Sequence, residues 1–157
     1  MQVRIFLVIV VLMLSGCSDD NDSLPAQQMS TAQSSFLSDN AARENVFVTE
    51  SGLQYEVLRA AEGPKPGAQS TVTVHYVGEF VDGTEFDSSI ARGTPSTFKL
   101  SQVIPGWTEG LQLMTVGSQF RFVIPSNLGY GERGRLPTIA PDTDLVFVVD
   151  LLEINSN

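Results

Sequence analysis

One segment with a helical pattern stands among segments patterned as strands, and this combination limits the folds open to the chain. In residues 106–114 the apolar side chains Trp107, Leu111 and Met114 recur at i, i+4 and i+7, so they share one face of a helix. Gly117 follows at a position suited to end that helix. We therefore expect a domain of the α+β class, built mostly of strands, with one short helix.

The strand-patterned segments are short and rich in β-branched and aromatic residues. Residues 71–77 alternate β-branched side chains, and residues 80–86 carry an Asp-Gly pair of the kind favoured in tight hairpins. Residues 145–149 have almost no polar face, so we expect their strand, which runs to residue 154, in the centre of the sheet. Further strands are predicted over residues 47–49, 52–58 and 119–124.

Two connecting segments carry loop signals. Residues 92–98 are predicted to be a loop, and residues 125–144 form a stretch of about 20 residues rich in Gly and Pro. Loops that long inside compact domains are usually functional. We therefore expect the second segment to contribute to a site.

The N-terminus predicts export. Arg4 precedes an apolar run, residues 5–14, which is too short to span a bilayer comfortably but suits the core of a signal peptide. The run ends in Leu-Ser-Gly-Cys, which resembles the lipobox of bacterial lipoproteins. This resemblance implies removal of residues 1–16 as a lipoprotein signal peptide and lipidation of Cys17. An ordinary secretory signal with an incidental cysteine, or an uncleaved anchor, remains open.

The segment that follows is polar and has few large apolar residues. We expect residues 17–45 to form a flexible tether and residues 46–157 to form the folded domain. Ser18 follows the cysteine, and in lipoproteins such a residue favours passage to the outer membrane. The expected location is the bacterial cell envelope, lipid-anchored at the outer membrane and facing the periplasm.

Charge and cysteine content exclude several function classes. The formal net charge of −9 argues against a nucleic-acid partner, because phosphate binding needs clustered Lys and Arg. One His and one Cys are too few for a zinc or iron-sulfur site, so no metal site is expected. Lys99, Arg121 and the remaining charged residues are interpreted as solvated surface.

Five motifs occur in a recognisable order. They are Val74-His75-Tyr76-Val77-Gly78, Gly83-Thr84-Glu85-Phe86-Asp87-Ser88-Ser89, Val103-Ile104-Pro105-Gly106-Trp107-Thr108-Glu109-Gly110, Leu128-Gly129-Tyr130-Gly131 and Leu145-Val146-Phe147. Together they resemble the FKBP-type peptidyl-prolyl cis-trans isomerases over about residues 46–154. Residues 49–55 are further similar to the entry strand of exported bacterial members such as the macrophage infectivity potentiator. The resemblance implies a twisted antiparallel sheet wrapped around one short helix.

The resemblance also implies a pocket for a proline ring. Trp107 would lie beneath the ring, and the walls would be Tyr76, Phe86, Phe98, Val103, Ile104 and Phe147. Tyr76, Asp87 and Tyr130 are the implied catalytic residues, with Asp87 and Tyr130 supplying polar contacts and the Ile104 N–H receiving a ligand carbonyl. The implied partners are proline-containing polypeptides and, as inhibitors, macrolide immunosuppressants. No cofactor is implied. The loop over residues 131–141 departs from some relatives, which place an aromatic residue or histidine there, so preference beyond proline is left open.

These residue types suit rotation about an X-Pro peptide bond, a reaction that needs no nucleophile. The barrier to this rotation is about 18–20 kcal/mol and arises from amide resonance. The planar amide is more polar than the twisted one, so a dry apolar cleft favours the transition state over the ground state. Asp87 is expected to orient tyrosines rather than transfer protons. Neither Ser88 nor Ser89 has a plausible base, which argues against a hydrolase.

Other interpretations remain open for the same residues. The cleft could serve as a proline-segment binding module or chaperone with little or no turnover. Phe86 and Phe147 could be ordinary core, and Asp87-Ser88-Ser89 could cap a turn. His75, in an alternating strand, is expected to be structural or to face outward.

Overall fold

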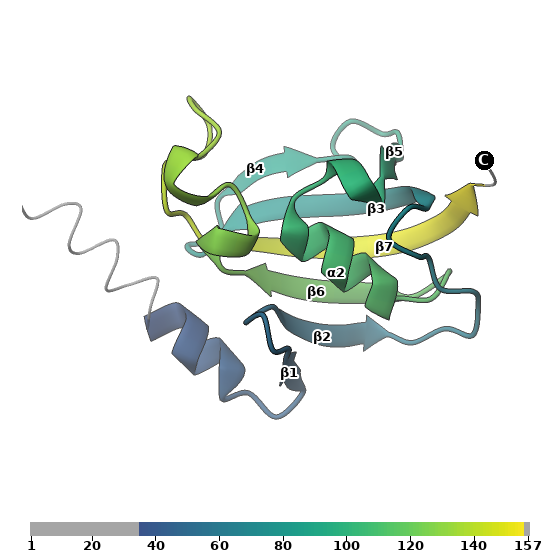
Figure 1. Ribbon diagram of the computed structural model, residues 1–157, viewed down its shortest axis with the longest axis horizontal. Coiled ribbons are helices and arrows are strands. Elements are labelled where there is room, and N and C mark those ends of the chain that lie inside the picture. Colours follow the sequence, from purple (N-terminus) through teal and green to yellow (C-terminus); the bar gives the residue numbers. More distant parts are fainter. Residues whose placement is uncertain (1–34, 156–157) are drawn as a thin grey trace, which may run out of the picture.

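A seven-stranded antiparallel sheet forms the body of the protein in the computed structural model, which describes residues 35–155 (Figure 1). The strands are β1 (Val46–Val48), β2 (Gln54–Arg59), β3 (Thr71–Phe80), β4 (Glu85–Ser88), β5 (Ser96–Lys99), β6 (Gln119–Ile124) and β7 (Leu145–Asn155). The predicted signal peptide, Cys17 and most of the predicted tether lie outside the described residues.

The apolar pattern of β7 and the alternating pattern of β3 match the places of these two strands in the sheet. The sheet runs β1-β2-β6-β7-β3-β4, with β5 also paired to β3. β7 lies between β6 and β3, as its nearly continuous apolar sequence predicts, and its first three residues, 145–147, are all buried. β3 alternates, with Val72, Val74 and Tyr76 buried and the residues between them partly exposed. One face of the sheet therefore carries the core.

The helix α2 (Pro105–Leu113) lies across that face, as Figure 1 shows. Pro105 suits the first helical turn because its missing N–H would have no partner there. Trp107 and Leu111 are buried on the shared face, as predicted, and Met114 directly after the helix is fully buried. Gly117 has φ of 90°, a left-handed conformation that glycine adopts without strain. The expected α+β fold is confirmed.

The β3–β4 hairpin is also confirmed. Gly83 has φ of 85°, and the Asp82 carboxylate accepts the N–H of Thr84 at 2.9 Å. Residues 125–144 form the predicted long connection, interrupted by the short 3-10 helices η2 (Ser126–Leu128) and η3 (Gly131–Arg133). This connection lies beside one end of α2 (Figure 1).

The prediction of a loop over residues 92–98 is wrong at its end. Residues 96–98 belong to β5, which pairs with the first half of β3 from Val72–Phe98 to Val74–Ser96. Phe98 is the one large apolar residue in this four-residue strand, so its sequence has too little alternation to signal a strand. Pairing with β3 supplies the hydrogen bonds that local sequence does not indicate.

The last part of the predicted tether is folded. Residues 35–41 form a helix, and Asn40 within it is only 5% exposed. Asn40 donates to Gln54 Oε1 at 2.7 Å and accepts from Arg121 at 2.9 Å, so the helix is bound to β2 and β6. Arg121 is therefore not the solvated surface charge that was expected. Within residues 35–155, no helix is both long enough and apolar enough to cross a membrane.

Candidate active site

Aromatic rings from four separate segments converge beside α2. The Trp107 ring stands edge-on to three others, with centroids 5.2 Å from Tyr76, 5.3 Å from Phe98 and 5.3 Å from Phe147. Phe86 extends the cluster, 5.6 Å from Phe147. Edge-to-face packing at these separations is favourable because the positive edge of one ring meets the negative face of another.

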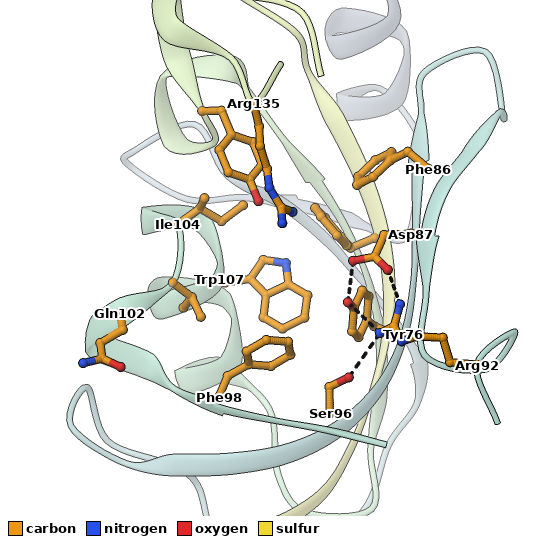
Figure 2. A pocket seen from close by; sticks show the side chains of 13 residues that line it. Tyr76, Phe86, Asp87, Arg92, Ser96, Phe98, Gln102, Ile104, Trp107 and Arg135 are labelled. Atoms are coloured by element: carbon orange, nitrogen blue, oxygen red, sulfur yellow. Dashed lines mark hydrogen bonds and ion pairs between the residues drawn. The ribbon is translucent and has the colours of Figure 1, made fainter. Parts of the chain in front are cut away.

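These rings border an open cavity of about 570 Å³, a volume typical of small-ligand sites. Figure 2 shows the Trp107 ring in the middle of the lining residues. All nine residues assigned from sequence to the pocket line it: Tyr76, Phe86, Asp87, Phe98, Val103, Ile104, Trp107, Tyr130 and Phe147. The structure therefore brings the whole predicted set together, from β3, β4, β5, the two residues before α2, α2 itself, β7 and the connection after η2.

The close approach of two of these rings depends on a glycine that ends the first sequence motif and to which no role was assigned from sequence. Gly78 in β3 pairs with Asp87 in β4 and with Phe147 in β7. A Cβ on Gly78 would lie 2.7 Å from an edge carbon of Phe147 and 2.8 Å from Cζ of Phe86. Glycine at this position lets both rings pack directly against the backbone of β3.

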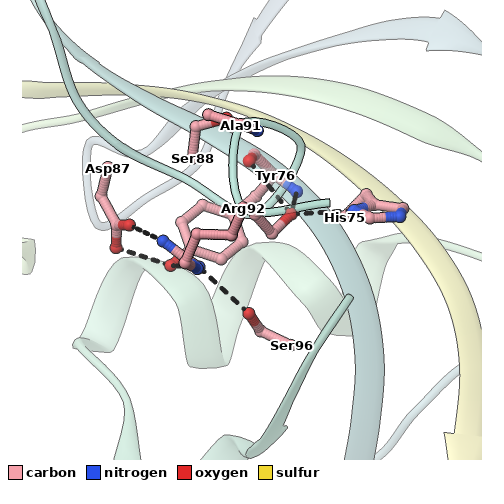
Figure 3. A network of polar contacts seen from close by, with 8 residues as sticks. His75, Tyr76, Asp87, Ser88, Ala91, Arg92 and Ser96 are labelled. Atoms are coloured by element: carbon pink, nitrogen blue, oxygen red, sulfur yellow. Dashed lines mark hydrogen bonds and ion pairs between the residues drawn. The ribbon is translucent and has the colours of Figure 1, made fainter. Parts of the chain in front are cut away.

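A polar network closes one side of the pocket. Tyr76 Oη donates to Asp87 Oδ2 at 2.6 Å, and Arg92 forms an ion pair with the other carboxylate oxygen. Arg92 also donates to Tyr76 Oη at 3.0 Å and to Ser96 Oγ at 3.2 Å (Figure 3). The carboxylate thus holds Tyr76 by its hydroxyl, as predicted for a residue that orients tyrosines.

This network moves two pKa values away from the neutral range. Burial raises the pKa of Tyr76, and the hydrogen bond to the Asp87 carboxylate raises it further. Burial opposes ionisation of Asp87, but the hydrogen bond from Tyr76 and the Arg92 guanidinium outweigh it and hold the pKa of Asp87 below its usual value. Asp87 is therefore a charged acceptor at neutral pH, and Tyr76 is a neutral donor.

Several donors on pocket-lining residues have no acceptor among the described residues. They include the backbone N–H of Ile104, the hydroxyl of Tyr130 and the indole N–H of Trp107, which is buried. A buried donor without a partner costs free energy, so such groups are usually satisfied when a site is occupied. The pocket can therefore receive carbonyl oxygens.

The serines and the histidine beside the pocket have structural contacts. Ser89 Oγ accepts the N–H of Tyr76 at 2.8 Å and lies 3.0 Å from Nδ1 of His75. Ser88 Oγ accepts the N–H of Ala91 at 3.1 Å, so it caps the turn, as one of the open interpretations held (Figure 3). His75 points away from the pocket-lining residues in this view.

Sequence reasoning missed four residues that line the cavity. Arg92, Ser96, Gln102 and Arg135 are part of the lining, although Arg92 had been taken as loop and all charged residues outside the motifs as solvated surface. Arg92 is five residues from Asp87, and in a loop this spacing does not predict that two side chains are close. The contact between them is seen only in the folded connection between β4 and β5.

Clusters of metal-binding side chains are not found in residues 35–155: no three His, Cys, Asp or Glu residues there lie close enough to hold an ion. The polar groups at the pocket are mainly hydrogen-bond donors, together with the Asp87 carboxylate, which is paired with Arg92. Groups of this kind suit hydrogen bonding to a peptide.

Comparison with known proteins agrees with this geometry. Residues 63–152 match the family described as FKBP-type peptidyl-prolyl cis-trans isomerase, and residues 19–57 match the domain amino-terminal to it. The chain is 56% identical over 119 residues to the FKBP-type peptidyl-prolyl cis-trans isomerase FkpA of Aeromonas hydrophila, covering 76% of this chain and 44% of that protein. It is 44% identical over 129 residues to the outer membrane protein MIP of Legionella longbeachae, covering 82% of this chain and 55% of that protein.

The fold comparison points the same way. The crystal structure of FkpA from Escherichia coli superposes with a TM-score of 0.79 at 40% identity, covering 83% of this chain and 61% of that one. The chain thus spans about half the length of the curated relatives described above. The family match covers more than half of the chain and includes every residue of the pocket, so the chain belongs to the FKBP-type peptidyl-prolyl cis-trans isomerase family.

Proposed function

We propose that this protein accelerates cis-trans isomerisation of X-Pro bonds in polypeptides, without a covalent intermediate and without a cofactor. The observation that carries the proposal is the convergence of the Tyr76, Trp107 and Phe147 rings, 5.2 to 6.3 Å apart, around an open cavity. Such an enclosure is the right size and polarity for a proline ring stacked on Trp107.

The acceleration comes from the exclusion of water by the apolar lining of the pocket. Rotation weakens amide resonance, so the twisted imide is less polar than the planar one and loses less on leaving water. An apolar lining therefore binds the twisted form more tightly than the ground state. A rate gain of ~10⁴ needs only about 5.5 kcal/mol of this preference.

Hydrogen bonds would hold the peptide on both sides of the bond that turns. The Tyr130 hydroxyl and the Ile104 N–H are the donors suited to flanking carbonyls, since neither has an acceptor among the described residues. Fixing both sides leaves rotation about one bond as the remaining freedom, which lowers the entropic part of the barrier. Asp87 acts by orienting Tyr76.

A proline-peptide isomerisation assay tests the proposal. The wild-type protein is expected to accelerate isomerisation of a Leu-Pro peptide, and Tyr130→Phe to lower kcat/KM about tenfold by removing one hydrogen bond made in the transition state. Trp107→Leu is expected to lower it further. Tyr55→Phe is the matched control, because Tyr55 stacks between Phe47 and Phe120 outside the pocket.

The outcome separates catalysis from binding. A folded wild-type sample that binds proline peptides, followed by fluorescence of the single Trp, but gives no acceleration would replace this proposal with a proline-segment binding module or chaperone. As a second readout, macrolides of the rapamycin type are expected to fill the pocket and block turnover.

We further propose that the protein is exported and anchored by lipid at Cys17, with residues 46–157 as the isomerase domain and the outer membrane, facing the periplasm, as its site. Support comes from the signal-like N-terminus, the motif ending at Cys17 and the name of the relative described as an outer membrane protein. Incorporation of labelled palmitate into the wild type and its loss in Cys17→Ser would test the anchor. Labelling that persists in the variant would refute it.

A further inference from the structure

The side chain of Arg135 lies over the mouth of the pocket. Its guanidinium carbon is 5.9 Å from the centroid of the Tyr130 ring, a cation-π separation, and Figure 2 shows it reaching over the cavity above Trp107. The backbone of Arg135 is bonded to that of Ile139 in both directions, at 2.8 and 3.0 Å. Ile139 is 1% exposed, so a buried residue anchors the loop that carries Arg135.

Arg135 forms no direct ion pair with another described residue, although its charge contributes to the lowered pKa of the Asp87 carboxyl. The ion pairs formed within the described part of the chain are Arg43–Glu56, Arg59–Asp150 and Arg92–Asp87, and none includes Arg135. Asp87 is the one acidic residue that lines the cavity, and both of its oxygens are engaged, by Tyr76 and Arg92. The charged lining residues are thus Asp87, Arg92 and Arg135, with a net charge of +1 in a chain of net charge −9.

A second hollow adjoins the proline pocket beneath this arginine. It has a volume of about 370 Å³ and is lined by Phe86, Asp87, Arg135, Leu136, Thr138 and Ile139. Phe86, Asp87 and Arg135 line both cavities, so the two lie side by side. When the proline of a peptide lies on Trp107, the residues next to that proline must extend out of the pocket, and the second hollow offers them a path. Glu132 and Arg133, the nearest charged residues along the chain, line neither cavity.

We propose that Arg135 is a specificity-determining residue that selects proline segments with an acidic side chain next to the proline. The carboxylate of Asp or Glu would enter the second hollow and pair with the guanidinium, which the Tyr130 ring already holds in place. The inference rests on the proposed isomerase function and adds a substrate class to it. The Coulomb attraction is partly exposed to solvent, so the expected preference is modest.

Peptide pairs that differ only in charge test this inference. Catalysed exchange would be measured by NMR for peptides with Glu or Gln directly before proline, and for a second pair with Glu or Gln directly after it. In the wild type, kcat/KM for the Glu peptide is expected to exceed that for its Gln partner about two- to fivefold in at least one pair. The preference should shrink at high salt, because screening weakens exposed ion pairs.

Variants assign the preference to one side chain. Arg135→Gln is expected to abolish the Glu-to-Gln ratio and Arg135→Glu to invert it, while Arg135→Lys keeps much of it. Arg133→Gln is the matched control, since it removes the same charge from the same loop at a position that lines neither cavity. A wild-type ratio of one or below in both pairs, or a ratio that survives Arg135→Gln, would overturn the inference.

A Leu-Pro peptide distinguishes this failure from failure of the proposed function. If the wild type accelerates Leu-Pro but shows no charge preference, the isomerase proposal stands and the role of Arg135 is refuted. If no peptide is accelerated, dissociation constants for the same pairs, from Trp107 fluorescence, decide whether Arg135 selects acidic segments in a binding module.

Discussion

At the scale of single residues, Asp87 is held as a carboxylate by two partners at one side of the pocket. Its carboxylate is shared between Tyr76 and Arg92, so the ionised form is stabilised and the Tyr76 hydroxyl is held at the carboxylate. The two pKa values move apart, that of Asp87 downward and that of Tyr76 upward. A site of this kind keeps one charge state over a wide pH range.

We expect kcat/KM to be constant between about pH 5 and pH 9. The stabilisation from Asp87 is fully present above its unfolded pKa of about 3.9 and is lost as pH falls through its lower folded value. That from Tyr76 is fully present below about pH 10 and is lost as pH rises through its higher folded value. Asp87→Asn is expected to lower the plateau and remove the acid limb. A wild-type midpoint between about pH 6 and 8 would contradict this account.

Gly78 offers a second test at this scale. Gly78→Ala would place a Cβ within 2.8 Å of both Phe86 and Phe147, so the rings must rotate or the strands must separate. We expect a loss of about 1–3 kcal/mol in the free energy of unfolding, measured with urea, and a lower kcat/KM. Glu79→Ala, at the next position and on the opposite face of β3, should change neither by a comparable amount. Wild-type behaviour of Gly78→Ala would show that the rings do not need this glycine.

At the scale of elements, α2 is positioned by its contact with the sheet more than by its own helix propensity. Gly110 and Gly106 are poor helix formers, yet both are buried in this nine-residue helix. A Cβ on Gly110 would lie 2.7 Å from the Phe122 ring, which is itself 1% exposed and cannot move aside. The glycines let α2 approach the sheet closely enough to bring Trp107 to the pocket.

Gly110→Ala therefore sets two effects against each other. Alanine favours the helix by about 1 kcal/mol, whereas overpacking in a core costs about 1–3 kcal/mol. We expect the overlap with Phe122 to prevail, so that urea unfolding shows a net loss of stability of about 1 kcal/mol. Gln112→Ala, in the same helix and only partly buried, should be close to neutral. A variant at Gly110 more stable than wild type would mean that α2 can move away from the sheet at little cost.

The elements also show how far local sequence is informative. The strands β2, β3, β6 and β7 and the helix α2 were predicted within a few residues, because each has a periodic apolar pattern of its own. β5 was missed because its four residues form a strand only against β3. A strand that forms only because it pairs with a neighbouring strand has no periodic pattern in its own residues.

At the scale of the whole molecule, the segment before the domain is bound to the outer strands of the sheet. The side chain of Asn40 makes hydrogen bonds to Gln54, Arg43 and Arg121. Arg43 also forms an ion pair with Glu56 at 2.9 Å. The helix over residues 35–41 therefore has a defined position on the sheet, on strands that do not line the pocket.

Asn40→Ala is expected to destabilise the fold without affecting the chemistry. It removes the donor to Gln54 Oε1 and the acceptor for the Arg121 guanidinium, at a cost of about 1–3 kcal/mol in urea unfolding. Amide exchange in residues 35–41 should quicken, while kcat/KM stays at the wild-type value. Ser38→Ala is the control, since that hydroxyl is exposed and bonds only within its own helix. Equal stability of the two variants would show that the helix is not held by Asn40.

By itself the sequence determined the α+β class, the central place of β7 and, through its resemblance to the FKBP-type family, the nine residues that meet at the pocket. The alternation of buried and exposed residues in a strand or helix depends on neighbouring residues, so it can be recognised in the sequence. Tertiary structure alone decided that Arg92 meets Asp87, that Arg135 stands over the pocket mouth and that Asn40 reaches Arg121, 81 positions away. A polar contact depends on where two side chains lie in space, and no period in the sequence records that position.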